Sequence, residues 1–190
     1  MNTVQPIRDL TKIKQMENIL RKQSIRDYML FRLGIYSGLR ISDILKLKVS
    51  DIRNQDYFIL KEQKTGKPKR LKIQPELKKE LKDYILGLNN DEYLFQSQKG
   101  DNLPIGRIQA WRIINNAAKK AKIKDPIGTH SLRKSFGYHL YTKNKNNPRI
   151  IPILQDIFNH SSSAITLRYI GISQDEKDSL LDDFSFDYVV

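Results

Sequence analysis

Apolar residues recur at spacings of three and four along most of this 190-residue chain, and that period constrains the possible fold more than any other feature. Helical spacing begins near Leu10, near Ile25, at Pro75, near Ile105, near His130 and at Pro148. Serine, glycine, proline and asparagine lie between these segments, where helices begin and end. The pattern therefore predicts a mainly α-helical fold.

One region departs from the helical period. It holds three short runs with strand character, separated by turn-forming residues, at Val49 to Ile52, Tyr57 to Leu60 and Arg70 to Ile73. They predict a small three-stranded antiparallel sheet, so the expected class is α+β, mainly α-helical. At this length we expect one domain over residues 1–171, followed by an acidic tail at 172–190.

The charge is unevenly distributed. Residues 1–170 carry 33 Lys and Arg against 15 Asp and Glu, a net charge of +18, whereas residues 171–190 carry 1 against 6, a net charge of −5. A strongly basic body favours a nucleic-acid partner, because each neutralised phosphate releases counterions. Charge alone would equally suit a basic protein with no such partner.

The chain has no cysteine, so neither disulfides nor thiolate metal ligands are available. Its first ten residues lack the apolar core of a signal peptide, and no apolar run is long enough to cross a membrane. We therefore expect a cytoplasmic protein with no membrane contact.

Seven polar residues stand out by type and order, namely Arg40, Asp43, Lys64, His130, Arg133, His160 and Tyr169. His130 and Arg133 are three apart near a predicted helix N-terminus, with Thr129 as the expected N-cap. Cations there oppose the helix dipole unless an anion binds, so a phosphate would suit the site. Taken one by one, these residues are more simply surface ions, structural histidines and a packed tyrosine.

In this order, arginine, lysine, His-x-x-Arg, histidine and tyrosine resemble the tyrosine recombinase (phage integrase) family over about Thr11 to Tyr169. The resemblance implies the catalytic-domain fold of that family, and double-stranded DNA as the partner. It also implies metal-free strand cleavage and rejoining without a cofactor, with chemistry like that of type IB topoisomerases. The family mostly has glycine where this chain has Asn159, a residue that also tolerates the left-handed conformation.

The resemblance also assigns roles. Tyr169 would attack the DNA and form a 3′-phosphotyrosyl link, and Arg40 and Arg133 would bind the phosphate oxygens. His130 would help remove the tyrosine proton, Lys64 would protonate the leaving 5′ oxygen, and His160 would hydrogen-bond the phosphate. Asp43 would hold an arginine or histidine in place. Lys61, Lys67 and Lys69 are competing candidates for the role of Lys64.

Family members carry a helical DNA-clamping domain before the catalytic domain, and here the first predicted helix begins near Leu10, so we expect that domain to be absent. An alternative function is a DNA-binding accessory or regulatory protein that keeps the fold without productive recombination. A basic RNA-associated structural protein is a third interpretation, which the charge permits and the motif set does not explain. Residues 172–190 combine acidic and apolar side chains, which favours protein rather than DNA as the partner of this tail. The family resemblance implies that the tail packs on a neighbouring protomer, which would give self-association on DNA. The alternative is a tail that folds back over the basic face of the free protein.

Overall fold

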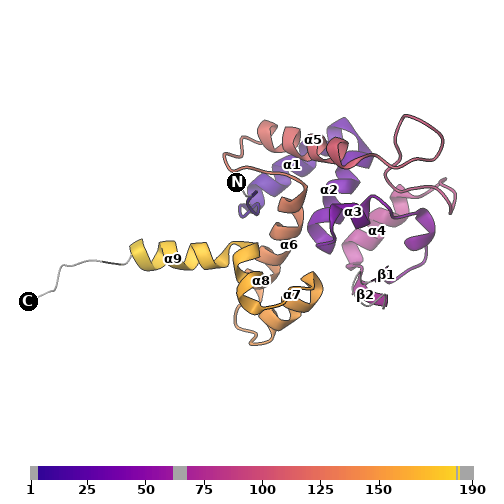
Figure 1. Ribbon diagram of the computed structural model, residues 1–190. Helices are drawn as coiled ribbons and strands as arrows, with labels where there is room; N and C mark the ends of the chain where they lie inside the picture. The colour runs from indigo at the N-terminus through magenta and orange to yellow at the C-terminus, as the bar shows by residue number, and fades with distance from the viewer. Residues whose placement is uncertain (1–3, 62–67, 183, 185–190) are drawn as a thin grey trace, which may run out of the picture. The chain divides into compact units, whose positions relative to one another are not determined.

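The computed structural model describes residues 4–61, 68–182 and 184. Its elements are α1 (Leu10–Gln23), α2 (Ile25–Ser37), α3 (Ile41–Ile44), the 3-10 helix η1 (Val49–Asp51), β1 (Tyr57–Lys61), β2 (Pro68–Lys72), α4 (Pro75–Tyr84), α5 (Arg107–Lys120), α6 (Thr129–Lys143), α7 (Ile150–Phe158), α8 (Ser163–Ile170) and α9 (Ile172–Asp182) (Figure 1). The predicted mainly helical α+β class is confirmed. Within the described residues, no helix is long and apolar enough to span a membrane.

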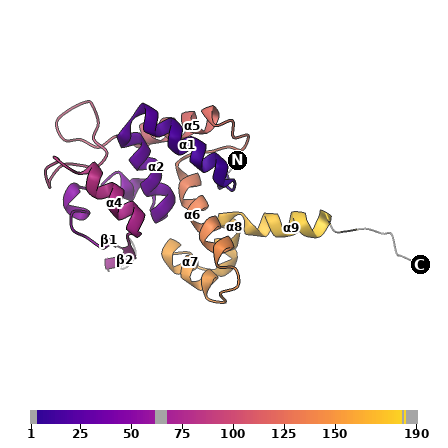
Figure 2. The ribbon, with the colours of Figure 1, turned by 180° about the vertical axis from the view of Figure 1, so that it is seen from behind.

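The chain forms two compact units, Met1–Phe136 and Gly137–Val190, and α6 contributes residues to both. In the first unit, α1, α2 and α5 lie side by side, as Figure 2 also shows from behind. Their apolar faces enclose a core that includes Met16, Leu30 and Ile114, each fully buried. The sequence predicts Ser24, a serine between two segments of helical period, as an N-cap. It separates α1 from α2 as predicted, because its hydroxyl accepts the Asp27 N–H at the start of α2.

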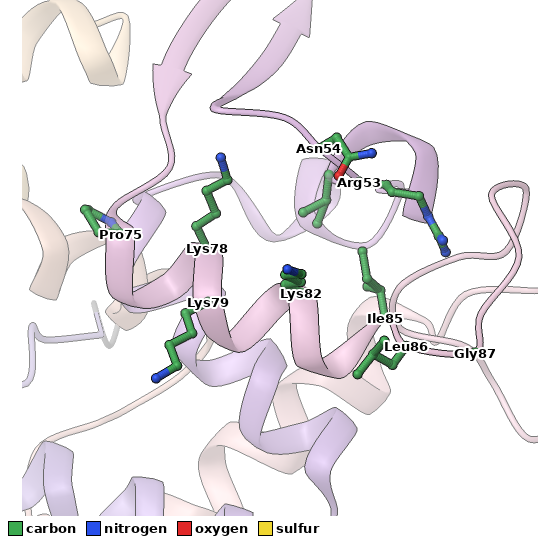
Figure 3. Close-up of a pocket in the computed structure, with 10 residues that line it drawn as sticks. Arg53, Asn54, Pro75, Lys78, Lys79, Lys82, Ile85, Leu86 and Gly87 are labelled. Carbon is green, nitrogen blue, oxygen red and sulfur yellow. The ribbon is translucent and has the colours of Figure 1, made fainter.

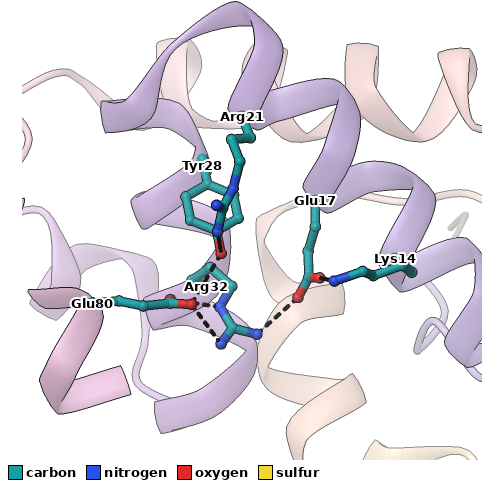
Figure 4. Close-up of polar contacts among 6 residues, drawn as sticks. All are labelled: Lys14, Glu17, Arg21, Tyr28, Arg32 and Glu80. Atoms are coloured by element: carbon teal, nitrogen blue, oxygen red, sulfur yellow. Dashed lines mark hydrogen bonds and ion pairs between the residues drawn. The ribbon is translucent and has the colours of Figure 1, made fainter. Parts of the chain in front are cut away.

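A buried ion network ties three helices of this unit together (Figure 4). The Arg32 guanidinium of α2 bonds both carboxylate oxygens of Glu80 in α4, at 2.8 and 3.1 Å, and Glu17 in α1 at 2.8 Å. The same guanidinium lies 4.0 Å from the centroid of the Tyr36 ring. A bidentate arginine–carboxylate pair fixes the relative orientation of the two side chains. The network therefore holds α1 and α4 against α2.

The sheet has two strands among the described residues, so the predicted third strand at Val49 to Ile52 is wrong. That segment begins instead with η1, because the Asp51 carboxylate accepts the Lys48 N–H at 2.8 Å and closes a turn. Val49 N–H then bonds to the Glu92 carbonyl rather than to a strand. The antiparallel pair β1 and β2 aligns Phe58 with Leu71, and Phe58 faces the core.

The helical period predicts a helix over about Ile105 to Ala121 with these residues facing inward: Ile108, Trp111, Ile114 and Ala118. It places these cations on the outer face: Arg107, Arg112, Lys119 and Lys120. Helix α5 begins at Arg107, two residues later than predicted, and does not bury all of its expected apolar face. Ile114 and Ala118 are buried as predicted, but Ile108 is 68% and Trp111 47% exposed, so their predicted inward orientation is wrong. Trp111 covers the turn before α6 instead, since a Cβ on Gly128 would lie 3.2 Å from its indole ring.

The second unit packs α7 against α8 around Leu154, Phe158 and Ile170. Asn159 ends α7 in the left-handed conformation, with φ 53° and ψ 49°, as predicted. Beyond α8 the acidic stretch continues as the helix α9, which the sequence analysis did not anticipate. The division into a catalytic domain and a tail remains a prediction.

Candidate active site

Arg40 lies just after the tight turn that ends α2. Side chains of α6 contact this turn and hold it in place. Gly38 ends α2 in the left-handed conformation, with φ 62°. The Arg133 guanidinium donates a hydrogen bond to the Gly38 carbonyl, and a Cβ on Gly38 would lie 2.4 Å from the Phe136 ring. The two predicted phosphate-binding arginines are therefore linked through one backbone turn.

Close packing of α6 on α2 supports this arrangement. Gly34 in α2 faces Leu132, and a Cβ on that glycine would lie only 2.5 Å from the leucine side chain. Arg133 and Leu132 are both buried, whereas Arg40 is exposed. One predicted arginine is thus held inside the fold while the other reaches solvent.

His130 is surrounded by positive charge. Partial desolvation lowers the pKa of its imidazole, and the charges of Arg133, Lys134, Arg40 and Arg107 lower that pKa further. Desolvation likewise lowers the pKa of the Lys134 ammonium, which is buried, and Arg8 contributes. Four cations and the start of a 15-residue helix converge here, which suits an anion such as a phosphate.

The structure gives less support to the other two predicted residues of the first unit. The Asp43 carboxylate in α3 accepts a hydrogen bond from the Ser42 hydroxyl at 3.4 Å. The Asp43 backbone N–H donates to the Arg40 carbonyl at 2.9 Å. Among the described residues its carboxylate has no bond to Arg40 or His130, so its predicted restraining role stays a prediction. Lys64 lies outside the described residues.

In the second unit, His160 and Tyr169 lie together. Their ring centroids are 5.0 Å apart, and Phe158 lies 5.3 Å from the histidine ring and 5.4 Å from the tyrosine ring. The His160 Nδ1 lies 3.1 Å from the hydroxyl of Thr166, which is buried and donates in turn to the Ser162 carbonyl at 3.2 Å. The fold therefore orients both predicted side chains on one aromatic cluster.

The predicted residues thus form two groups, Arg40 with His130 and Arg133 in one unit, and His160 with Tyr169 in the other. The sequence predicts the helix break at Gly38 but not its contact with Arg133. It also does not indicate Lys134 or Thr166, whose roles depend on contacts that no local spacing reveals. Arg107 was noted only as an outward cation of α5. Within residues 4–61, 68–182 and 184, no three His, Asp or Glu side chains form a possible metal-binding group.

A basic hollow lies between the turn after η1 and helix α4 (Figure 3). Arg53, Lys78 and Lys82 line it, above an apolar floor that includes Ile85. Lys78 is paired with Asp56, and Arg53 donates to the Leu88 carbonyl at 2.5 Å. Of the predicted catalytic residues that the structure describes, none lines this hollow.

Comparison with known proteins supports the resemblance to the tyrosine recombinase (phage integrase) family. The sequence profile of the phage integrase family matches residues 8–176, and the chain belongs to that family. It is 47% identical over 175 residues to the probable integrase/recombinase YoeC of Bacillus subtilis strain 168, covering 92% of this chain and 93% of YoeC. The resemblance inferred from the sequence is confirmed.

The chain is also 29% identical over 165 residues to the tyrosine recombinase XerA of Pyrococcus furiosus, covering 85% of this chain and 56% of XerA. It thus spans about half the length of several relatives.

Solved structures show the same fold. A crystal structure of XerA recombinase matches 97% of this chain and 68% of that one, with a TM-score of 0.72 and 22% identity. The catalytic domain of bacteriophage HP1 integrase matches 99% of both chains, with a TM-score of 0.60 and 19% identity. The fold is therefore that of a tyrosine recombinase catalytic domain.

Proposed function

We propose that this protein is a site-specific DNA recombinase that cleaves and rejoins DNA strands through a 3′-phosphotyrosyl intermediate. The observation that carries the proposal is the convergence of Arg40, Arg107, Arg133 and Lys134 on His130, in a chain of the phage integrase family. Such a cluster favours a dianionic, five-coordinate phosphate over a neutral ligand.

The chemistry follows from these residues. The Tyr169 hydroxyl loses its proton and attacks the phosphorus, forming a phosphotyrosyl bond as the bond to the 5′ oxygen breaks. Arg40 and Arg133 stabilise the charge on the non-bridging oxygens. His130, whose lowered pKa keeps it neutral near pH 7, accepts the tyrosine proton. The 5′ hydroxyl of the cleaved or partner strand reverses the step, as in type IB topoisomerases, so rejoining needs no separate energy source.

The remaining roles concern Lys64, His160 and Asp43. Lys64 is proposed as the acid that protonates the leaving 5′ oxygen. His160, oriented through its ring nitrogen by Thr166, is proposed to hydrogen-bond the phosphate. Asp43 is proposed to restrain a neighbouring arginine or histidine.

Duplex DNA is the proposed partner. A relative of the same fold, XerH, has been solved with its difH substrate before and after cleavage, matching 97% and 96% of this chain with TM-scores of 0.70 and 0.69. The net charge of +18 over residues 1–170 supports binding to phosphates that weakens steeply with salt.

Self-association on DNA through the acidic segment is also proposed. Helix α9 and the residue beyond it expose Leu180, Leu181 and Phe184 by 73%, 70% and 63%. Apolar side chains on an acidic helix suit a protein surface better than DNA. Deleting residues 173–190 should lower the number of protomers per DNA duplex in mass photometry, and an unchanged stoichiometry would count against this role.

The function is tested with a suicide duplex nicked beside the scissile phosphate, incubated with the protein and resolved on a denaturing gel. The recombinase assignment predicts a protein–DNA band that survives denaturation. If the protein binds duplexes taken from the DNA that flanks its own gene but gives no such band, the accessory or regulatory function is favoured instead.

A further inference from the structure

The N-terminal segment, residues 4–8, is hydrogen-bonded to the helix that carries His130. The Ile7 N–H donates to the Ser135 hydroxyl at 2.7 Å, and that hydroxyl donates to the Ser131 carbonyl at 2.7 Å. Ser131 closes the turn before α6 twice, since its hydroxyl accepts the Gly128 N–H at 3.1 Å and its N–H donates to the Gly128 carbonyl at 3.0 Å. A continuous set of bonds therefore runs from residue 7 to the turn beside His130.

Other contacts hold the same segment in place. The Gln5 N–H donates to the Pro126 carbonyl at 3.0 Å. Gly128 is tightly covered, because a Cβ there would lie 3.2 Å from Trp111 and 3.4 Å from Val4. Ile7 is 2% exposed, so the segment is packed as well as bonded.

Both serines in this set are completely buried. Ser135 bonds the carbonyl of its own helix one turn earlier, an arrangement that leaves its oxygen free to accept from another segment. Here the acceptor position is used by Ile7. Replacing the hydroxyl would strand a buried N–H and loosen the first turn of α6.

The orientation of His130 depends on that turn. Its ring is exposed and has no hydrogen-bond partner among the described residues, so no side chain fixes its direction. The backbone between Gly128 and Ser131 sets the position of the His130 Cα and the direction of its Cα–Cβ bond. The contacts that fix this backbone therefore also fix the point from which the imidazole extends.

We propose that residues 4–8 and Ser135 form a positioning device for His130. Ser135 acts through the turn and touches neither the DNA nor the reacting atoms, so it is a positioning residue. The catalytic consequence rests on the proposed function, whereas the effect on the histidine itself does not.

The first test measures covalent-complex formation by Ser135→Ala on the suicide duplex at saturating DNA. We expect a rate about tenfold lower with duplex affinity within about twofold of wild type, because a displaced general base slows chemistry more than binding. Leu77→Val is the control, since it trims a fully buried side chain in α4 without touching α6. An unchanged rate, or a loss no larger than that of Leu77→Val at matched stability, would overturn the proposal.

The second test needs no activity. The His130 imidazole is titrated by NMR in wild type and in Ser135→Ala, and we expect its lowered pKa to return toward the ordinary value as the turn moves away from the surrounding cations. Identical titration curves would contradict the positioning role. If wild-type protein forms no covalent complex at all, the proposed function fails while this titration still decides the inference.

Discussion

The rings of His160 and Tyr169 meet edge to face, with centroids 5.0 Å apart and planes inclined at 72°. Phe158 contacts both rings and is fully buried. Aromatic packing of this kind holds the tyrosine ring in place. The same ring contacts should persist in a variant that lacks only the hydroxyl oxygen.

Tyr169→Phe should abolish covalent attachment to the suicide duplex while leaving duplex affinity within about twofold of wild type, because it removes only the attacking oxygen and keeps the ring contacts. Denaturing gels and a binding titration measure the two quantities. Tyr138→Phe, in the same unit, is the matched control and should retain activity. Covalent product from Tyr169→Phe would exclude this residue as the nucleophile.

Gly38→Ala should destabilise the protein by about 2 to 4 kcal/mol, because alanine would adopt φ 62° and its Cβ would meet the Phe136 ring at 2.4 Å. Gly87→Ala is the control, since this glycine also has a positive φ, of 82°, but nothing lies within 4 Å of the added Cβ. Gly87→Ala should lower the free energy of unfolding by about 1 kcal/mol. Urea unfolding of both variants measures the difference, and equal losses would show that the contact with α6 is loose.

The lowered pKa of His130 predicts a pH dependence of stability. In the unfolded chain His130 takes up a proton near the ordinary histidine pKa of about 6.5. In the folded protein its pKa is lower, so the imidazole stays neutral at that pH. Stability is therefore fully present above about pH 6.5 and is lost as the pH falls toward the lowered pKa. His130→Gln should lose less thermal stability than wild type between about pH 7.5 and about pH 5.5. An equal loss in both proteins would show that His130 titrates normally.

Lys64→Ala should slow cleavage of ordinary DNA by about a hundredfold or more, and should spare a substrate whose leaving 5′ oxygen is replaced by sulfur. A thiolate leaves without a general acid, so the sulfur substrate isolates the step assigned to this lysine. Cleavage rates of both substrates by wild type and variant measure it. If sulfur gives no rescue, Lys64 is not the acid, and Lys67 is the next candidate.

Much of the fold could be predicted from local signals. The helical period located every long helix from α1 to α7, and the conformational preference of Asn159 correctly ended α7. The prediction of a third strand was wrong although Val49 to Ile52 has residues typical of strands. The Asp51 carboxylate closes a turn there by accepting the Lys48 N–H, three residues earlier in the chain. Short apolar runs do not distinguish these outcomes.

The sequence predicted the residues of the candidate site, but not the contacts that hold them in place. Motif order identifies His130 and Arg133, yet the contact of Arg133 with Gly38 joins positions 95 residues apart in the chain. Trp111 was expected in the core because it follows the apolar period of α5. It lies over Gly128 instead, near Val4, and the helical period of α5 cannot predict such a long-range contact.

The proposed mechanism depends on Tyr169 as the residue that attacks DNA. Mass spectrometry of the protein trapped on the suicide duplex, after digestion with nuclease and trypsin, identifies the attached residue. Cleavage after Arg168 and Lys177 releases residues 169–177, and we expect a nucleotide attached to this peptide through a 3′ phosphate on Tyr169. A nucleotide on Tyr138 or Tyr141, or a trapped protein with no nucleotide on any tyrosine, would contradict it.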